Sequence, residues 1–271
     1  MVKLYLIRHA ESLSNKMKED IFKMFKISMN ETKLCLAYKL IKDNDVIDSL
    51  LSEKGKEQCK ETRENNMDKI GKITHVIASP LRRCLETARI ILDTKKLKDE
   101  GKVLDIRGEV RELLCCQGDF PMMVKESMES FREFDFASIE EEVDRYGEFF
   151  FVNYLENQRT KSDILDYLEQ MEDDTTKDTK VDFLLDLLKK RLMENHLLEK
   201  NHDIYVRTQK FKKQLKEYIK KNNIKDGQLV IVTHMRIIKA WTAKDFNEKT
   251  DEYVDFIDPE NACFLEVELD A

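Results

Sequence analysis

Short runs of apolar residues along the chain have the pattern of buried β-strands. A continuous run of this kind, bounded by polar residues, is typical of a central strand in a parallel sheet whose two faces are both covered. The last segment, 261–269, alternates apolar and polar residues and predicts a strand at an edge of the sheet. The continuous runs lie at 4–7, 73–79, 103–107 and 228–233.

Between these runs, apolar residues recur at the spacing of amphipathic helices. Ser52 is placed to cap a further helix, and Gly55 inside that helix permits a close approach by a neighbouring segment. The helical spacing is found near 17–25, 34–41, 181–192 and 211–219.

The segment 120–201 has a different character from the rest of the chain. Clusters of aromatic residues, such as 149–151, alternate there with acidic runs, which predicts a helical insertion. We interpret these aromatic residues as core rather than as substrate-stacking residues. The polar stretch 171–180 lacks any periodicity and predicts a loop between two helices.

Arginine and histidine residues directly follow the first and the last of the four continuous apolar runs. Arg8 and His9 come after the first run, and His234 comes after the last. Ligands in open α/β sheets bind at the carboxyl ends of the strands, so a site is expected here. Arginine offers a planar fork for phosphate oxygens, and a histidine is nucleophilic near pH 7, which together favour phosphoryl chemistry. Taken alone, Arg8 and His9 would also fit an ordinary strand end that faces solvent.

The second run leads into the sequence SPLRRCLETA, residues 79–88. Pro80 favours the start of a helix, and the free amide groups at a helix N-terminus attract phosphate. Arg82 and Arg83 both lie in this first turn. Because successive helical residues point about 100° apart, only one of them can share a site with Arg8.

Composition and charge narrow the class of protein. The 271 residues include a charged fraction of 37%, with few glycines and prolines, which favours a helix-rich globular chain. The formal net charge of −7 argues against nucleic acid as the main partner. No apolar run approaches the ~18 residues of a membrane span, so we expect no membrane partner and an unsecreted, cytoplasmic protein.

The cysteines predict neither a disulfide scaffold nor a metal site. There are six of them, none in CxxC spacing, so reduced thiols are expected. The adjacent pair Cys115 and Cys116 is expected simply to pack, because no matched ligands stand nearby in the sequence. The chain also lacks P-loop and dinucleotide-binding motifs, and we expect no cofactor.

Four motifs resemble one known family. The sequence RHAESLSN, residues 8–15, resembles the RHGxSxxN or RHAxSxxN signature of the histidine phosphatase superfamily, in its phosphoglycerate-mutase-like branch. DSLLSEKGKEQ is similar to its DxxLTxxGxxQ motif, SPLRRCLETA to SPLxRAxxTA, and VTHMRII to THGxxI. The resemblance implies a single domain over 1–271, an α/β fold of three α/β/α layers with a mostly parallel central sheet, and a helical cap insertion at about 120–201.

The resemblance also implies roles for individual residues. His9 would attack phosphorus, and a protonated His234 would help to oppose the charge on the transferred phosphoryl group. Arg82 falls on a variable position of the motif. The phosphate-binding residues would be Arg8, Asn15, Arg83 and His234.

The proton donor and one glycine of the family pattern are less well defined. Glu112, in the phrase VREL, matches the LxE pattern that follows the third strand in the family, and Glu109 is the reserve candidate. A glutamic acid with a raised pKa could protonate the leaving oxygen. Met235 stands where the family has glycine, and its bulk predicts a difference in substrate shape or activity.

The sequence therefore predicts a phosphatase that hydrolyses phosphomonoesters through a phosphohistidine on His9, with no metal. Its partner would be a small phosphorylated substrate or a phosphopeptide. A phosphoglycerate mutase would use the same pocket, and a non-catalytic phospholigand-binding scaffold would keep it without turnover. The sequence fixes neither the substrate nor the oligomeric state.

Overall fold

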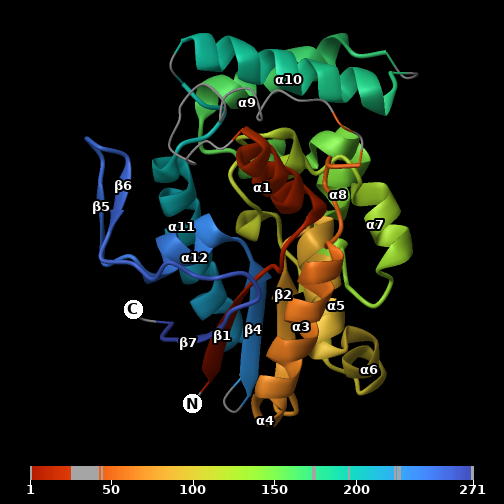
Figure 1. Ribbon diagram of the computed structural model, residues 1–271, viewed down its shortest axis with the longest axis vertical. Helices are drawn as coiled ribbons and strands as arrows, with labels where there is room; N and C mark the ends of the chain where they lie inside the picture. The colour runs from red at the N-terminus through yellow and green to blue at the C-terminus, as the bar shows by residue number, and fades with distance from the viewer. Residues whose placement is uncertain are drawn as a thin grey trace.

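The computed structural model describes residues 2–25, 43, 45–172, 175–194, 196–222, 224 and 227–269. The helix predicted near 34–41, and Cys35 with it, lie outside the described residues. A five-stranded sheet stands at the centre of the chain, with the strand order β3-β2-β4-β1-β7 (Figure 1). Its strands are β1 (Lys3–Arg8), β2 (Ile73–Ala78), β3 (Val103–Ile106), β4 (Gln228–Thr233) and β7 (Phe264–Val267).

The sheet is mixed, as predicted. Strands β1 to β4 pair in parallel, and β7 is added antiparallel to β1 at the edge. A separate hairpin is formed by β5 (Asp245–Asn247) and β6 (Glu252–Val254). The described α-helices are α1 (Leu13–Phe25), α3 (Glu53–Asn65), α4 (Met67–Ile70), α5 (Arg82–Leu92), α6 (Thr94–Asp99), α7 (Val124–Ser130), α8 (Ala137–Tyr146), α9 (Gln158–Gln170), α10 (Lys177–Met193), α11 (Asn201–Lys221) and α12 (Met235–Thr242), and the 3-10 helices are η1 (Gly108–Val110), η2 (Gln117–Asp119) and η3 (Gly147–Tyr154).

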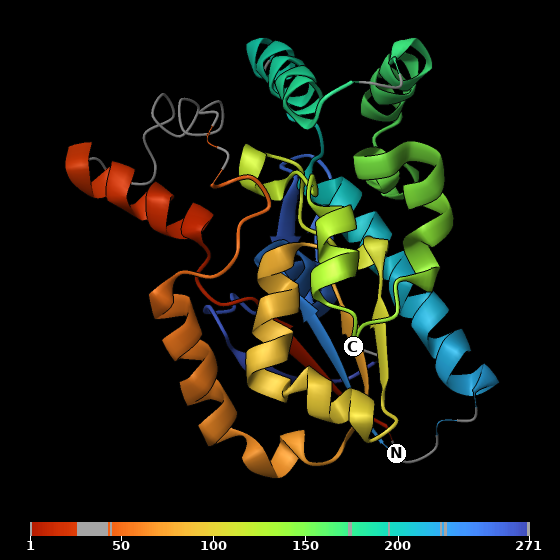
Figure 2. The ribbon, with the colours of Figure 1, turned by 90° about the vertical axis from the view of Figure 1, so that its right-hand side faces the viewer.

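Helices cover both faces of the sheet, because its strands are apolar on both sides. In β1, Tyr5 and Ile7 belong to the core cluster that includes side chains of α3 and α5. Leu4 and Leu6 pack in a different cluster, which includes side chains of α11 and α12. Figure 2 shows α3 and α11 on opposite sides of the sheet. The predicted α/β class with three layers is therefore confirmed.

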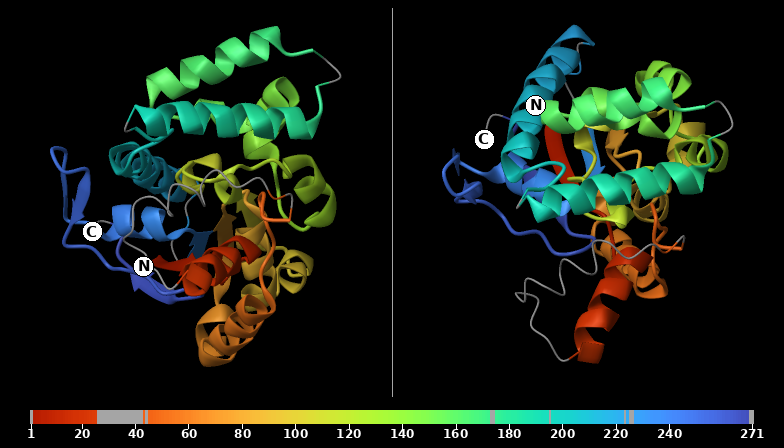
Figure 3. Two further views of the ribbon diagram at one scale, coloured as in Figure 1. Left: turned by 45° about the horizontal axis from the view of Figure 1, so that its top comes forward. Right: turned by 90° about the horizontal axis from the view of Figure 1, so that it is seen from above.

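The helical segment after residue 120 lies toward the carboxyl ends of the strands. Figure 3, seen from above, shows α9 and α10 lying over this end of the sheet. The side chains of 149–151 are fully buried in the same cluster as Tyr5, so they are core residues, as predicted. The loop predicted at 171–180 is shorter than expected, because Thr176 caps α10 by accepting a hydrogen bond from the Thr179 amide. The single-domain organisation with a cap stays a prediction.

Two small residues behave as the sequence predicts. The Ser52 side chain caps α3 by accepting from the amide of Gly55. A Cβ on Gly55 would lie 2.1 Å from the carbonyl oxygen of Glu11, so the close approach requires glycine. This contact holds α3 against the loop that follows β1.

Candidate active site

Three neighbouring strands end at the same edge of the sheet. Arg8 is paired with Thr233 in the β1–β4 ladder, and Ala78 of β2 is paired with Val232. The ladder continues one residue further, because the His9 amide donates to the carbonyl of Thr233 at 2.9 Å. His9 and His234 therefore leave adjacent strands at one level, and their ring centroids are 5.1 Å apart.

His9 is held as a neutral base. Its side chain is buried, and Nδ1 lies 2.7 Å from the carbonyl oxygen of Ala10. A carbonyl only accepts, so Nδ1 carries the proton and Nε2 keeps its lone pair. Burial lowers the pKa of His9 well below 6.5, and the charges of Arg83 and Arg8 lower it further. Nε2 of His9 is therefore an unprotonated nucleophile at neutral pH.

His234 is also neutral, which corrects the expectation of a protonated ring. Its Nδ1 lies 3.3 Å from Nη2 of Arg83, which can only donate, so Nε2 carries the proton and donates to Oγ of Ser79 at 2.8 Å. Burial lowers the pKa of His234 well below 6.5, and Arg83 and His9 add to this shift. The ring is a hydrogen-bonding partner within a cationic cluster rather than a cation itself.

The two predicted arginines differ in how they are held. Arg83 is buried at the start of α5 and donates to the carbonyl of Gly118 and, at 3.0 Å, to Oδ1 of Asp119. Arg8 is half-buried and donates from Nη1 to the carbonyl of Pro259 at 2.8 Å, while its buried Nε has no hydrogen-bond partner among the described residues. Both guanidiniums therefore keep N–H donors that an anion could use.

Arg82 makes none of the contacts of Arg83 among the described residues, in line with its variable position in the motif. Its side chain is only half-buried, and its backbone amide donates to Oδ1 of Asp48 at 2.9 Å. Asp48 is fully buried, and burial raises the pKa of its carboxyl group to about 7. This contact anchors the first turn of α5, which carries Arg83.

Of the two candidate proton donors, the geometry favours Glu112. Its side chain is buried, and burial raises its pKa, with the Asp119 carboxylate adding to the rise. Its charge interacts with those of both Arg8 and Arg83. Glu109 also has a pKa raised by burial, but it lines a cavity beside α11, and its charge interacts with those of Arg107 and Arg207 rather than with those of Arg8 and Arg83.

The side chain of Asn15 is engaged with the loop that follows β1. Its Oδ1 accepts from the amide and the hydroxyl of Ser12, at 3.2 and 3.1 Å. The hydrogen bonds of Asn15 in the described part of the chain all go to Ser12. Its role as a phosphate donor stays a prediction.

Met235 enters the helix start without strain. It is the first residue of α12, directly after the N-cap residue His234, and its backbone is not in the left-handed region. Its half-buried side chain lines a cavity together with Arg236 and Tyr253. The side chain at the position of the motif's glycine therefore forms part of the wall of this cavity.

The residues that support Glu112 could not be found from the sequence. Arg111 donates to the carbonyl of Glu112 at 2.8 Å and to the carboxylate of Glu199 at 2.7 Å. Glu199 also accepts from the amide of Leu114 and from Arg207, at 2.9 and 2.8 Å. The side chains of Arg111, Glu199 and Arg207 are all buried. No motif marks this ionic triad, and the same is true of Asp119.

No α-helix in the described part of the chain is both long enough and apolar enough to cross a membrane. No curated protein sequence matches the chain. Solved structures that are similar to it include a phosphoserine phosphatase from Entamoeba histolytica (16% identity, 89% of this chain and 77% of that chain, TM-score 0.37). Others are a phosphoglycerate mutase from Bacillus anthracis str. Sterne (17%, 88% and 77%, TM-score 0.42) and the ecdysone phosphate phosphatase from Bombix mori (14%, 97% and 88%, TM-score 0.44). These TM-scores are low, so the fold is assigned here from strand order and register.

A family match bears directly on the predicted resemblance. The family model named histidine phosphatase superfamily (branch 1) matches residues 44–148. The matched range includes two of the four motifs, those at 48–58 and 79–88, and with them Arg83. The match confirms the predicted resemblance over residues 44–148; the motifs at 8–15 and 232–238 lie outside the matched range.

Proposed function

We propose that this protein is a phosphatase that hydrolyses phosphomonoesters through a phosphohistidine on His9. The observation that carries the proposal is the state of the His9 ring. Its Nδ1 proton is fixed on the carbonyl of Ala10, and its Nε2 is left unprotonated among two arginines and a second histidine. Such a ring can attack phosphorus without first losing a proton.

In the first step, the lone pair of Nε2 of His9 forms a bond to phosphorus while the bond to the ester oxygen breaks. The protonated carboxyl group of Glu112 gives its proton to the leaving oxygen. In the second step, Glu112 takes a proton from water, whose oxygen attacks phosphorus and releases the histidine. Arg8 and Arg83 oppose the charge on the equatorial oxygens in both steps.

Arg83 has donors to spare for this task. A guanidinium offers five N–H groups, and the contacts of Arg83 with Gly118, Asp119 and His234 use three of them. The remaining donors could bind a phosphoryl oxygen while Asp119 holds the side chain in place. Because Asp119 offsets part of the positive charge, the pocket favours an anion without becoming an uncompensated buried cation.

The mutase alternative has the same first step but returns the phosphoryl group to a second hydroxyl of the substrate. Met235, in place of the glycine of the resembled motif, favours the phosphatase, because it adds a side chain directly after His234 and departs from the pattern of the mutases. A binding scaffold without turnover would need neither the unprotonated nitrogen of His9 nor an acid with the raised pKa of Glu112.

We infer a small phosphorylated metabolite or a phosphopeptide as the substrate, and a cytoplasmic location. The five cysteines that the structure describes are free of disulfides, which supports a reducing compartment. Fractionation of cells would test the location. A screen of phosphorylated metabolites and phosphopeptides, assayed beside interconversion of 2- and 3-phosphoglycerate, would separate the phosphatase from the mutase.

The decisive experiment compares wild type with His9→Ala. Wild type should give an acid-labile, base-stable phosphoenzyme when it is quenched during turnover, and His9→Ala should give none and lose at least about 10⁴-fold in kcat. His202→Ala is the matched control, because the ring of His202 contacts Glu248 and Phe246 rather than His9 or Arg83. Full turnover by His9→Ala, or a phosphoenzyme that survives this substitution, would contradict the proposal.

A further inference from the structure

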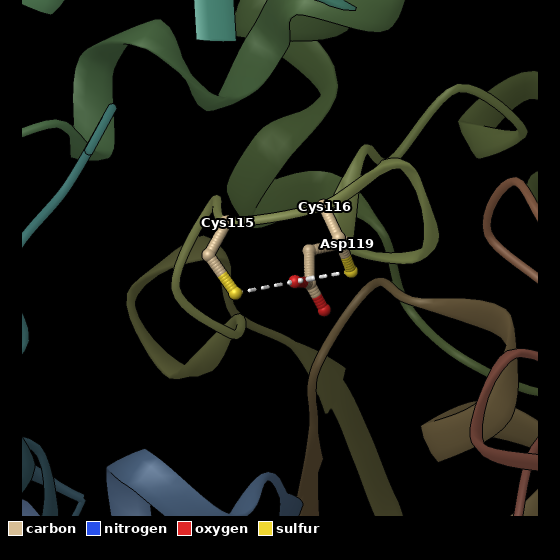
Figure 4. A group of neighbouring side chains, drawn as sticks. All are labelled: Cys115, Cys116 and Asp119. Atoms are coloured by element: carbon tan, nitrogen blue, oxygen red, sulfur yellow. Dashed lines mark hydrogen bonds between the residues drawn. The ribbon is translucent and has the colours of Figure 1, made fainter. Parts of the chain in front are cut away.

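Two thiols and one carboxylate converge beside Arg83. Sγ of Cys115 and Sγ of Cys116 lie 3.3 and 3.1 Å from the same oxygen, Oδ2 of Asp119 (Figure 4). One ligand atom from each residue lies within 4.8 Å of the other two. The proposed phosphatase reaction uses none of these three side chains on the substrate.

The spacing is close to that of a zinc site with three protein ligands. Zinc–sulfur bonds of ~2.3 Å and zinc–oxygen bonds of ~2.0 Å at tetrahedral angles place sulfur and oxygen ligands about 3.5 Å apart. The two sulfur–oxygen distances in the structure are shorter than this by only a few tenths of an ångström. If the two sulfur atoms and the carboxylate oxygen moved apart by a few tenths of an ångström, the ion would fit between them.

The surroundings suit the charge that a metal would bring. Two thiolates, a carboxylate and Zn²⁺ sum to −1, which is also the charge of the present cluster of two thiols and one carboxylate. Arg83 donates to Oδ1 of Asp119, the oxygen that the thiols do not use, and Arg236 approaches Sγ of Cys115 at 3.8 Å. Such outer hydrogen bonds orient ligands in known metal sites.

The three side chains are buried enough to retain an ion, yet each is slightly exposed, so that the ion can exchange with solvent. The exposed fractions of Cys115, Cys116 and Asp119 are 8%, 9% and 8%, so the cluster is dry but not sealed. Thiolate ligands select soft or borderline ions over Mg²⁺ and Ca²⁺.

We propose that Cys115, Cys116 and Asp119 form a binding site for Zn²⁺. On binding, each thiol loses its proton and forms a bond from sulfur to zinc, Oδ2 of Asp119 forms the third bond, and two protons are released to solvent. Because the charge of the cluster does not change, Asp119 keeps its ion pair with Arg83. The metal therefore fixes the segment 115–119 and takes no part in the reaction at His9.

The first test uses Co²⁺ as a spectroscopic probe for the zinc site in the full chain. Titration should produce thiolate-to-cobalt charge-transfer bands that saturate at one ion per chain and disappear when Zn²⁺ displaces the cobalt. Zn²⁺ binding should release about two protons and raise the Tm. Cys116→Ser should lower the affinity at least about tenfold.

Cys263→Ser is the matched control, because Cys263 is the described cysteine outside the buried set and lies at the far end of the chain. The absence of thiolate-to-cobalt bands in wild type would overturn the proposal. So would bands that persist unchanged in the double variant Cys115→Ser, Cys116→Ser.

A second measurement needs no variant, and so does not depend on whether substituted chains fold. In wild type, Zn²⁺ should protect Cys115 and Cys116 from alkylation, read peptide by peptide in a mass spectrometer, and leave the rate at Cys263 unchanged. Equal alkylation rates at 115 and 116 with and without Zn²⁺ would reject the site. Both measurements are independent of the phosphatase activity.

Discussion

The candidate site has two halves that are held in different ways. The strand-end half, with His9, His234 and Arg83, is fixed by the parallel ladder of β1, β2 and β4 and by the first turn of α5. The acid half is the segment that carries Glu112 and Asp119, which has only two short 3-10 turns. Backbone hydrogen bonds position the first half, and the buried side chains of Arg111, Glu199 and Arg207 position the second.

This difference shows how a segment without regular secondary structure can still hold its side chains in defined positions. The β-sheet positions its residues through hydrogen bonds between backbone N–H and C=O groups, which do not depend on the side chain. The acid half depends instead on particular side chains, and the loss of one of them leaves buried charges unpaired. The acid half should therefore respond to substitution at positions remote from the reacting atoms.

The largest expected effect comes from removing the proton donor of the acid half while the nucleophile of the strand-end half stays intact. Glu112→Gln should lower kcat by about 10²- to 10⁴-fold on alkyl phosphates, whose leaving oxygen needs a proton. It should change the rate on p-nitrophenyl phosphate far less, because nitrophenolate leaves unprotonated. The two substrates are compared by steady-state kinetics.

The pH profile of the same variants gives an independent reading. The pKa of Glu112 is raised by burial, so its acid form, and with it the rate, is lost as the pH rises through that pKa. The acid limb should lie below pH 6.5, because burial lowers the pKa of His9. Glu112→Gln should abolish the basic limb, and Glu109→Gln should keep it; the reverse result would move the role to Glu109.

The next effect tests the ionic support of the acid half. Glu199→Gln removes the charge shared by Arg111 and Arg207 and should lower the free energy of unfolding by about 3–5 kcal/mol, since both guanidiniums stay buried. The measurement is denaturant unfolding. Glu266→Gln, which breaks an exposed pair with Lys3, should lower the free energy of unfolding far less than Glu199→Gln. Equal losses of unfolding free energy in the two variants would show that the buried ionic triad does not support the acid half.

The smallest effect concerns the strand-end half, through the carboxyl group that anchors α5. The pKa of Asp48 rises from 3.8 to about 7 in the folded chain, so its contribution to stability is present below pH 3.8 and lost as the pH rises through 7. Three pKa units correspond to at most about 4 kcal/mol.

Asp48→Asn should therefore gain stability relative to wild type as the pH rises from about 4 to 8, in unfolding experiments across that range. The amide oxygen can still accept from the Arg82 amide, and asparagine tolerates the positive φ of 44° at this position. A stability difference that is independent of pH would show that the carboxyl group stays ionised in the folded chain.

The same contrast explains what the sequence could predict. Apolar runs and the residues that end them predicted β1, β2 and β4 correctly, and with them the meeting of His9 and His234. Helical geometry predicted that only one of Arg82 and Arg83 joins the site, and the motif resemblance selected Arg83. The motifs could not reveal Asp119 or Glu199, because each acts through a pairing between distant segments that leaves no local pattern. The predicted protonation of His234 was wrong for a related reason: burial, with Arg83 and His9, lowers its pKa, and these neighbours are not apparent from the sequence around it.

The place of β1 in the sheet also bears on how the chain folds during synthesis. Both neighbours of this first strand, β4 and β7, come from beyond residue 227. A nascent chain therefore has neither partner of β1 until residues beyond 227 have left the ribosome, and the apolar strand stays unpaired through that interval. The pocket can thus form only long after its nucleophile has been translated.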